Sequence, residues 1–372
     1  MKRFFKSIIT LISFLAAFFL LLSVLTAYIS PSHTWILPFL GFGFPVLWLL
    51  NLVLAIFWMV RKRWQFLFPT IALLITFSHW TNTFQWKAVP LDKEEKLENS
   101  LSIMSFNVRM FDMYNWSGEK DVQEKIFELI RKENPDVLCL QEFYSTTAKG
   151  VFNENYILSR LNQYKYKHIE YHSGKRGRRN FGLITVSKYP IAEKGSVKFK
   201  HTTNFSIQTD IEAHGQRIRV FNNHLESIRL TPKHLNFIDS LNYKNDKERR
   251  EGVKEITDKL RSAFQHRADQ AERLGKHISN SPFPAIVCGD FNDTPVSYVY
   301  RQMRGDLKDA FVESGKGFGG TYNGILPSFR IDFIFHDKRF NSYGFKKIDV
   351  NYSDHYPIMT TINLQEEVPT DS

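Results

Sequence analysis

The hydrophobic and polar positions divide this sequence into an apolar N-terminal part and a mixed remainder. Three long apolar runs occupy residues 8–29, 35–60 and 66–84. Each run approaches or exceeds the roughly 20 residues that a helix needs to cross the core of a bilayer. A secretory signal sequence is the alternative interpretation of the first run, because basic residues precede it. Since two more runs follow, the pattern predicts a membrane anchor of three transmembrane helices over residues 1–90.

The Lys and Arg residues of this part lie on one side of the predicted spans. Because Lys and Arg favour the cytoplasmic side, we expect the N-terminus and the second connector in the cytoplasm. Three crossings then place all later residues outside it, which predicts a multi-pass protein of the cell (inner) membrane with an extracytoplasmic domain, periplasmic where an outer membrane exists. The basic residues are Lys2, Arg3 and Lys6 before the first run, and Arg61, Lys62 and Arg63 between the second and the third.

After a charged linker at residues 91–100, short apolar segments alternate with amphipathic ones. Residues 121–142 have the pattern of a helix that ends before Pro135 and is followed by a buried strand. Residues 248–279 carry apolar side chains at helical spacing. Strands and helices mixed in this way over residues 101–372 predict one large α/β or α+β domain.

The net charge of the chain has a different interpretation when the predicted anchor is counted separately. The formal net charge is +11, which alone would suggest an anionic partner such as nucleic acid. Residues 1–90 hold seven of the 49 Lys and Arg residues and none of the 38 Asp and Glu residues. The remainder therefore has 42 basic and 38 acidic residues, a net charge of +4. Most of the excess reflects membrane topology rather than binding of a polyanion.

The two cysteines, Cys139 and Cys288, each lie inside an apolar run. Neither belongs to a pair with the spacing of a metal site. We expect two buried core thiols, and a disulfide between them is the alternative outside the cytoplasm.

Several predicted strands of the second part end in compact polar residues. Taken singly, each of these has an ordinary interpretation as a turn residue or an exposed strand end. Asp332 differs, because it interrupts the apolar run "RIDFIF", and burial of a carboxylate is costly unless the group is paired or binds a cation. The residues are Asn107, Glu142, His224, Glu226, Asp290, Asn292, Asp293, Asp332, Asp354 and His355.

Taken together, these residue types favour one kind of chemistry. Carboxylate and amide oxygens suit a hard cation such as Mg²⁺, whereas no Cys and His spacing indicates zinc. Two histidines beside carboxylates can change charge near neutral pH. Hydrolysis of a phosphodiester needs an activated water, neutralised charge on the phosphoryl oxygens and a proton for the leaving oxygen, and this set can divide those tasks.

The segments "SFNVR", "LQE", "NNHLES", "GDFND", "RIDFIF" and "SDHYP" follow one another in this order across residues 102–357. They closely resemble the successive motifs of the endonuclease/exonuclease/phosphatase superfamily, which includes DNase I-like nucleases, inositol-phosphate phosphatases and neutral sphingomyelinases. The resemblance implies a DNase I-like four-layer α/β/β/α sandwich, with two mixed sheets face to face and the site at the strand ends. It also implies a hydrolase of phosphodiester or phosphomonoester bonds that depends on Mg²⁺ or Mn²⁺.

The resemblance implies metal and substrate ligands among the motif residues. Glu142 would be the main metal ligand, with Asn107 beside it and Asp354 joining them. Arg109 would bind substrate. Arg109 and His224 both resemble the DNase I-like branch more than the abasic-site endonucleases, which have other residue types near these positions.

The same resemblance implies catalytic roles for five residues. Asp290 would position or deprotonate the attacking water, and Asn292 would hold that water or the phosphate. His355, oriented by Asp332, would contact the phosphate or activate the water. His224 would stabilise the transition state or protonate the leaving group.

The substrate is left open between three alternatives. The anchor favours a small or lipid phosphoester held near the bilayer, which we take as the first hypothesis. His224, Arg109 and a loop at residues 175–179 with four basic side chains favour an extracytoplasmic nuclease. A non-catalytic membrane binding module is the third alternative, which the intact motif set disfavours. The expected partners are the bilayer and a phosphoester substrate, and no obligate protein partner is evident in the sequence.

Overall fold

The computed structural model describes residues 2–90, 99–173, 177–200, 202–229, 246–324 and 328–365. The predicted linker at residues 91–100 lies almost wholly outside these ranges. The chain divides into two compact units. The first unit holds Met1–Phe84, Ile228–Asp269 and Asp293–Gln302, and the second holds Gln85–Ser227, Gln270–Asn292 and Met303–Ser372.

The first unit begins with a helix that agrees with the first predicted span. α1 (Lys2–Val24) continues into the 3-10 turn η1 (Leu25–Ala27). Within them, Lys6–Ala27 is long and apolar enough to cross a membrane, and 28% of its most apolar stretch is buried. In the described part of the chain, this is the one helix that meets both criteria.

The second and third predicted spans are interrupted, so the prediction of three membrane-spanning helices is wrong in that form. The run at residues 35–60 divides into α2 (Leu37–Phe42) and α3 (Phe44–Val60), because Pro45 has no N–H to continue the helix. The run at residues 66–84 breaks at Thr76, whose hydroxyl donates a hydrogen bond to the Ala72 carbonyl at 2.8 Å and competes with the backbone pattern. Its pieces are η2 (Trp64–Phe66), α4 (Leu67–Ile75) and α5 (Phe77–Thr83).

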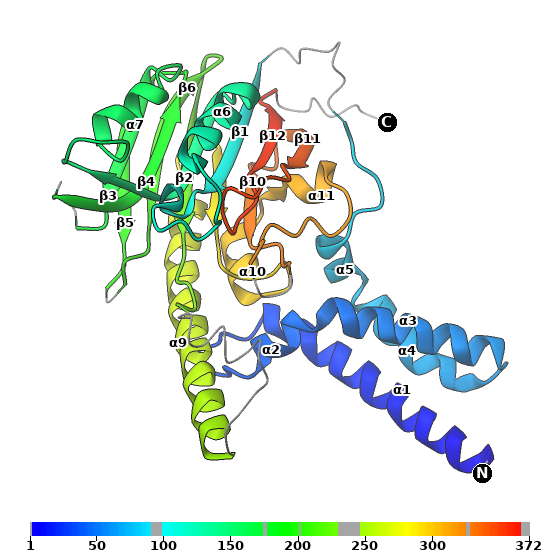
Figure 1. Cartoon of the computed structure of the whole chain (residues 1–372). Helices are drawn as coiled ribbons and strands as arrows, with labels where there is room; N and C mark the ends of the chain where they lie inside the picture. Colours follow the sequence, from blue (N-terminus) through cyan, green and yellow to red (C-terminus); the bar gives the residue numbers. More distant parts are fainter. Residues whose placement is uncertain are drawn as a thin grey trace. The chain divides into compact units, whose positions relative to one another are not determined.

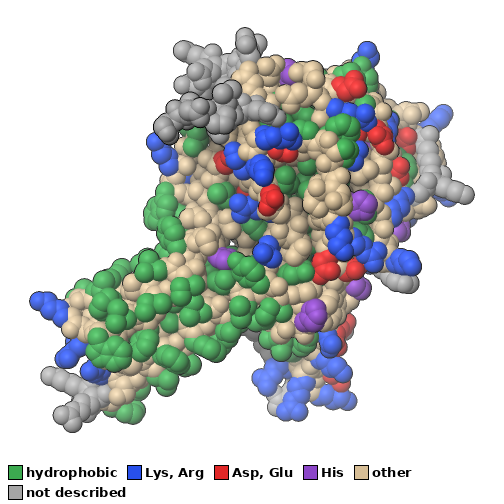
Figure 2. All heavy atoms as spheres, turned by 180° about the vertical axis from the view of Figure 1, so that it is seen from behind, with side chains coloured by type: hydrophobic (Ala, Val, Ile, Leu, Met, Phe, Trp, Pro, Cys, Tyr) green, Lys and Arg blue, Asp and Glu red, His purple; other side chains and the backbone are tan. Residues whose placement is uncertain are grey.

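Apolar side chains cover much of the surface of these helices. Leu11 of α1 is 58% exposed, and Val46 of α3 and Leu74 of α4 are each 71% exposed. Figure 2 shows apolar side chains gathered over these helices, interspersed with other atoms. A surface of this kind is typical of helices that meet lipid.

Two later segments pack against the N-terminal helices within the first unit. The ring of Phe264, in α9 (Asp246–Ser279), lies 5.3 Å from the ring of Phe39. The Thr26 hydroxyl donates to the Val296 carbonyl at 2.7 Å, and just beyond it begins α10 (Tyr298–Arg304). The first unit is therefore built from segments that are distant in sequence.

The second unit contains a sheet of six strands in the order β11-β12-β1-β2-β4-β3 (Figure 1). β1 and β2 run parallel and place Asn107 opposite Gln141. The outer face of this sheet packs on α6 (Val122–Glu133) and α7 (Glu154–Arg160), whose buried side chains include Phe127 and Ile157. The strands are β1 (Ser100–Asn107), β2 (Val137–Thr146), β3 (Tyr166–Tyr171), β4 (Arg179–Ser187), β11 (Asn341–Lys347) and β12 (Ile358–Asn363).

A second sheet of six strands has the order β5-β6-β7-β8-β10-β9. β7 and β8 run parallel, with His224 opposite Asp290. β10 runs antiparallel to β8, with Asp332 opposite Asp290. The strands are β5 (Ile191–Lys198), β6 (Phe205–Ala213), β7 (Gln216–His224), β8 (Ala285–Asp290), β9 (Lys308–Asp309) and β10 (Asp332–His336), and α11 (Ala310–Ser314) follows β9.

One apolar core joins the two sheets face to face. Ile103 and Cys139 from the first sheet and Ile286, Cys288 and Ile334 from the second are fully buried in it. Both cysteines are free thiols, as expected. The mixed α/β sandwich of two sheets confirms the predicted fold class, and its parallel strand pairs bring several strand ends to one edge.

Candidate active site

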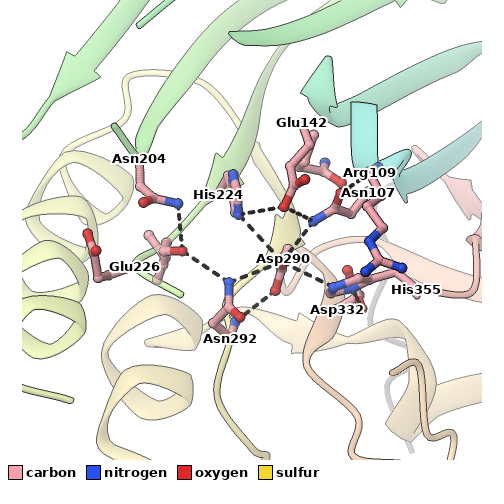
Figure 3. Close-up of polar contacts among 12 residues, drawn as sticks. Asn107, Arg109, Glu142, Asn204, His224, Glu226, Asp290, Asn292, Asp332 and His355 are labelled. Atoms are coloured by element: carbon pink, nitrogen blue, oxygen red, sulfur yellow. Dashed lines mark hydrogen bonds and ion pairs between the residues drawn. The ribbon is translucent and has the colours of Figure 1, made fainter. Parts of the chain in front are cut away.

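The residues that the sequence assigned to one site lie together at the strand ends of the second unit (Figure 3). Hydrogen bonds and ion pairs link every member of the set to another. They come from β1, β2, β7, β8 and β10, from the segments that directly follow β1 and β8, and from the loop before β12. The contacts join Asn107, Arg109, Glu142, His224, Asp290, Asn292, Asp332, Asp354 and His355.

The first sheet contributes an amide and a carboxylate from neighbouring strands. The Asn107 amide donates to Glu142 Oε1 at 3.3 Å and to Asp290 Oδ2 at 3.0 Å. Glu142 lies at a shift in the β2–β4 register between Leu140 and Phe143, and its φ is +50°. This irregularity turns the side chain out of the alternation of the strand, as bulges near active sites do.

The end of β8 depends on Gly289. Its φ is +131°, and a Cβ atom there would stand 2.0 Å from the Asn223 carbonyl oxygen of β7. A glycine is therefore needed both for the backbone conformation and for the close approach of β7. The next residue, Asp290, is 1% exposed.

Asn292 orients the Asp290 carboxylate through two hydrogen bonds. Its backbone N–H donates to Asp290 Oδ1 at 2.8 Å, and its side-chain amide donates to Asp290 Oδ2 at 3.1 Å. The same amide donates to the Leu225 carbonyl at 3.1 Å. Asn292 has a φ of +54°, so its conformation is specific to this turn.

Asp332 and His355 form a hydrogen-bonded pair beside Asp290. His355 Nδ1 and Asp332 Oδ2 are 2.9 Å apart, and His355 Nε2 lies 3.6 Å from Asp290 Oδ2. Tyr322 pairs with His355 in a short β-bridge and sets its ring edge-on to the imidazole. The imidazole therefore has a fixed orientation between two carboxylates.

His224 faces the same carboxylates from the other side. Its Nε2 lies 3.7 Å from Glu142 Oε1 and 3.7 Å from Asp290 Oδ2. Among the described residues, this buried nitrogen has no hydrogen-bond partner. A buried polar atom without a partner is costly unless a ligand or water meets it, so His224 points into space suited to a polar ligand.

The environment gives the two histidines opposite charge states. Burial alone would lower the pKa of His355, but Asp332 and Asp290 raise it well above its ordinary value. Burial lowers the pKa of His224, against the attraction of Asp290. At neutral pH, His355 is therefore positively charged and His224 is neutral.

The two main carboxylates of the site are both less acidic than usual. Burial raises the pKa of Asp290 to about 6, with Asp332 adding to the rise and His355 opposing it. Burial also raises the pKa of Glu142, and the nearby Asp354 charge adds to this rise. Ionisation of either carboxyl group therefore costs free energy, and a nearby cation would lower that cost.

Arg109 connects the site to a segment that the sequence did not single out. Its Nε lies 3.3 Å from Asp354 Oδ2, and its guanidinium carbon lies 4.4 Å from the centre of the Trp116 ring. Its backbone N–H donates to Asn107 Oδ1 at 3.0 Å. Trp116 gave no motif signal, because its role depends on the fold of the loop.

Two other polar residues near the motifs have structural roles. The Glu226 carboxylate accepts a hydrogen bond from the Thr202 hydroxyl. The Asp293 carboxylate lies 3.4 Å from Arg267 Nε, in the first unit. Asn204, which the sequence did not indicate, donates to the same Leu225 carbonyl as Asn292, at 2.9 Å. Motif spacing does not reveal this hydrogen bond, because Asn204 lies just before β6, far from Asn292 in the sequence.

The donor set fits a divalent cation. Four carboxylates face Arg109 and the charged His355, which leaves an excess of negative charge. Asp290, Asp332 and His355 also form a compact group of potential ligand atoms, within 4.8 Å of one another. The family resemblance assigns these three to catalysis and assigns Asn107, Glu142 and Asp354 to the metal.

Comparisons with known proteins found matches to two family models. A model of the Endonuclease/Exonuclease/phosphatase family matches residues 104–355. A second family model, of a domain of unknown function (DUF8431), matches residues 6–83. The search of curated proteins found no match.

Solved structures with a similar fold include two that align with 72% of this chain. An endonuclease/exonuclease/phosphatase from Beutenbergia cavernae DSM 12333 is 16% identical, with a TM-score of 0.52, and the alignment covers 72% of this chain and 72% of that one. D. rerio TDP2 complexed with single strand DNA product is 21% identical, with a TM-score of 0.50, and the alignment covers 72% of this chain and 100% of that one. At these identities, the likeness shows the fold alone.

Proposed function

Because the chain belongs to the Endonuclease/Exonuclease/phosphatase family, we propose that it is a membrane-tethered hydrolase of phosphodiester bonds that depends on Mg²⁺ or Mn²⁺. The observation that carries the proposal is the arrangement around Asp290. A buried carboxylate with a raised pKa lies between the charged His355 and the neutral His224 and faces Glu142. This arrangement suits proton transfer next to bound phosphate.

Asp290 is the group that we assign to the attacking water. Its pKa of about 6 leaves it ionised at neutral pH yet basic enough to accept a proton. The amides of Asn107 and Asn292 donate to its Oδ2 and hold the carboxylate in one orientation. As the water oxygen forms its bond to phosphorus, its proton passes to Asp290.

The two histidines would act on the phosphate and on the leaving oxygen. His355, charged and held by Asp332, is placed to contact a phosphoryl oxygen and balance its charge. His224 is neutral before substrate binds, and an anionic phosphate beside it would favour its protonated form. It could then give a proton to the leaving oxygen as the bond from phosphorus to that oxygen breaks.

We assign the cation to Glu142, with Asn107 and Asp354 nearby, rather than to the compact Asp290, Asp332 and His355 group. A histidine must lose its proton to bind a metal, and the carboxylates around His355 hold that proton strongly. Glu142 and Asp354 offer oxygen ligands, which Mg²⁺ prefers. A cation bound there would neutralise charge on the phosphoryl oxygens.

The membrane tether is supported by the first unit. Lys6–Ala27 has the length and composition of a membrane span, and the exposed apolar side chains of α3 and α4 suit lipid. We propose a multi-pass anchor whose later crossings are interrupted helices, with the second unit outside the cytoplasm, from the distribution of Lys and Arg. This topology can be tested by fusing to the C-terminus a reporter that is active only in the cytoplasm. Activity of that reporter would overturn the topology.

Two substrate classes follow from these features. The tether favours a small or lipid phosphoester near the bilayer. The alternative is an extracytoplasmic nuclease, favoured by Arg109 beside the site and by the basic loop at residues 175–179, of which Arg178 and Arg179 are exposed. A nuclease arm therefore belongs in any test.

The test uses the full-length protein in nanodiscs with Mg²⁺. The substrates are plasmid DNA, single-stranded DNA, RNA, sphingomyelin and a chromogenic phosphodiester. We expect hydrolysis of at least one substrate by the wild type and its loss in Glu142→Ala and His355→Ala. Matched controls are Glu193→Ala, whose side chain is 61% exposed, and His277→Ala, which is also exposed. Equal activity in wild type and both site variants would refute the site.

A further inference from the structure

The loop that follows β1 has an unusual and fixed backbone. In η3 (Arg109–Asp112) all four residues have positive φ, from 43° to 55°, although none is a glycine. Phe111 anchors this left-handed turn, since it is 2% exposed and packs on the rings of Phe127 and Phe143. Strained backbone that the surrounding core holds in place is typical of functional loops.

The next part of the loop is tied to the turn through Asp112. Asp112 Oδ1 accepts a hydrogen bond from the Trp116 N–H at 2.7 Å and another from the Ser117 N–H at 3.3 Å. The Ser117 hydroxyl donates to Asp112 Oδ2. The backbone at Trp116 is therefore fixed, whereas its side chain is partly exposed to solvent.

This loop displays two aromatic rings, Tyr114 and Trp116, which we call the aromatic shelf. Tyr114 is 57% exposed and Trp116 is 43% exposed, with ring centres 4.9 Å apart. Arg109 lies over the Trp116 ring and also pairs with Asp354 of the candidate site. One side chain thus links the shelf to the place where we put the scissile phosphate.

The same edge of the first sheet carries further cations and a third exposed ring. β2 continues past Glu142 to Thr146, which pairs with Arg179 at the start of β4. Arg178 and Arg179 are exposed, and Phe181 is 43% exposed. Two residues of the basic loop at 175–179, Lys175 and Arg176, lie outside the described residues. The cations and rings that base stacking requires come from separate segments, so the loop sequence alone does not reveal them.

We propose that the aromatic shelf binds a nucleobase, so that the substrate of the site is single-stranded nucleic acid. This inference rests on the proposed phosphodiester hydrolysis. Exposed aromatic rings beside a positively charged groove are how proteins hold single strands, with bases stacked on the rings and phosphates on the cations. The shelf lies among Arg109, Asp112, Asn115 and Ser117, and such a polar surround suits a nucleotide better than the acyl region of a lipid.

The test measures binding, so that it does not depend on turnover. Full-length protein carrying Asp290→Asn is placed in nanodiscs and titrated against a fluorescent thymidine oligomer of about 12 nucleotides, within the usual range of site sizes. An oligomer of abasic residues with the same number of phosphates is the comparison. Fluorescence anisotropy at fixed ionic strength gives both dissociation constants.

We expect the thymidine oligomer to bind about tenfold or more tightly than the abasic one. Trp116→Ala should weaken binding of the thymidine oligomer by roughly 5- to 100-fold, because each base–ring stack contributes about that much. The same change should bring the two dissociation constants close together. Trp116→Phe should keep most of the preference, and Trp86→Ala, which removes a 76% exposed tryptophan elsewhere, should keep all of it.

The cations are tested separately by salt dependence. Arg178→Ala with Arg179→Ala should weaken both oligomers alike and lower the slope of log affinity against log salt by about 0.7 for each lost phosphate contact. Equal affinity for thymidine and abasic oligomers in the parent protein would overturn the proposal. So would equal weakening by Trp116→Ala and Trp86→Ala, or displacement of the oligomer by dihexanoyl phosphatidylcholine but not by thymidine monophosphate. Failure of hydrolysis in the preceding assay would instead refute the proposed function.

Discussion

The two sheets bring different chemistry to the candidate site. The first sheet and its loops supply Asn107, Glu142 and Asp354, whose oxygens suit a cation, and Arg109 beside them. The second sheet supplies His224, Asp290 and Asp332, which can exchange protons. Neither set could complete the proposed hydrolysis alone, so the packing of the two sheets is what assembles the candidate site.

Two bonds between the sheets join these sets. The Asn107 amide of β1 donates to Asp290 of β8 at 3.0 Å. His355, in the loop before β12, pairs with Asp332 of β10 at 2.9 Å. The adjacent residues Asp354 and His355 therefore serve opposite sides, because Asp354 turns to Arg109 while His355 turns to the second sheet. The following changes separate the two contributions.

Removal of the Asp290 charge should have the largest effect. Asp290→Asn keeps the size of the side chain and most of its hydrogen bonds but cannot accept the proton of the water. We expect kcat to fall by about 10²- to 10⁴-fold, the usual contribution of a general base. Steady-state kinetics on the substrate found above measures this. Asp349→Asn, at a carboxylate that is 73% exposed, is the control, and equal kinetics in the two variants would disprove the assignment.

Glu142→Gln tests the cation side. The substitution removes the main proposed oxygen charge, so the concentration of Mg²⁺ that gives half-maximal activity should rise by at least about tenfold. Glu193→Gln should leave this concentration unchanged. If Glu142→Gln also leaves it unchanged, the cation binds elsewhere, and the Asp290, Asp332 and His355 group becomes the better assignment.

Gly289→Ala tests whether the close approach of β7 and β8 matters. The new Cβ would meet the Asn223 carbonyl oxygen at 2.0 Å, so one strand must move. Gly150→Ala is a matched control, since Gly150 has a φ of +130° and no atom within 4 Å of the new Cβ. Urea unfolding should show that Gly289→Ala lowers the free energy of unfolding by about 2 kcal/mol more than the control does. Equal losses would mean that backbone conformation alone requires the glycine.

Asp332→Asn should have a smaller effect, mainly on pH dependence. The amide oxygen can still accept the hydrogen bond from His355, but the negative charge that raises the pKa of His355 is lost. The charged form of His355 should then disappear at a lower pH, and the alkaline limb of kcat/KM should move down in pH. An unmoved alkaline limb would show that His355 does not set it.

The sequence predicted the catalytic half of the molecule better than the anchor. Short motifs such as "GDFND" carry both the strand and its polar end, so Asp290 and Asn292 could be placed from local pattern. Apolar runs carry less information, because hydrophobicity alone did not reveal the helix breaks at Pro45 and Thr76. Membrane topology beyond Lys6–Ala27 stays a prediction.

The loop after β1 shows why part of the site could not be predicted. Positive φ is expected at glycine, yet Arg109, Met110, Phe111 and Asp112 all adopt it here. The burial of Phe111 and the bonds to Asp112 hold that conformation, and both depend on the folded domain. The aromatic shelf is for this reason invisible to motif spacing.

The pH dependence of kcat/KM at saturating Mg²⁺ tests the central assignment most directly. The ionised form of Asp290 must be present, and its pKa is raised from an ordinary 3.8 to about 6. A bound cation lowers this pKa toward its ordinary value, so the acid limb of kcat/KM should lie between about pH 4 and pH 6, with a fall of about tenfold for each pH unit below it. A kcat/KM that is the same at both ends of this range, or an acid limb that is unchanged in Asp290→Asn, would contradict Asp290 as the base and the mechanism built on it.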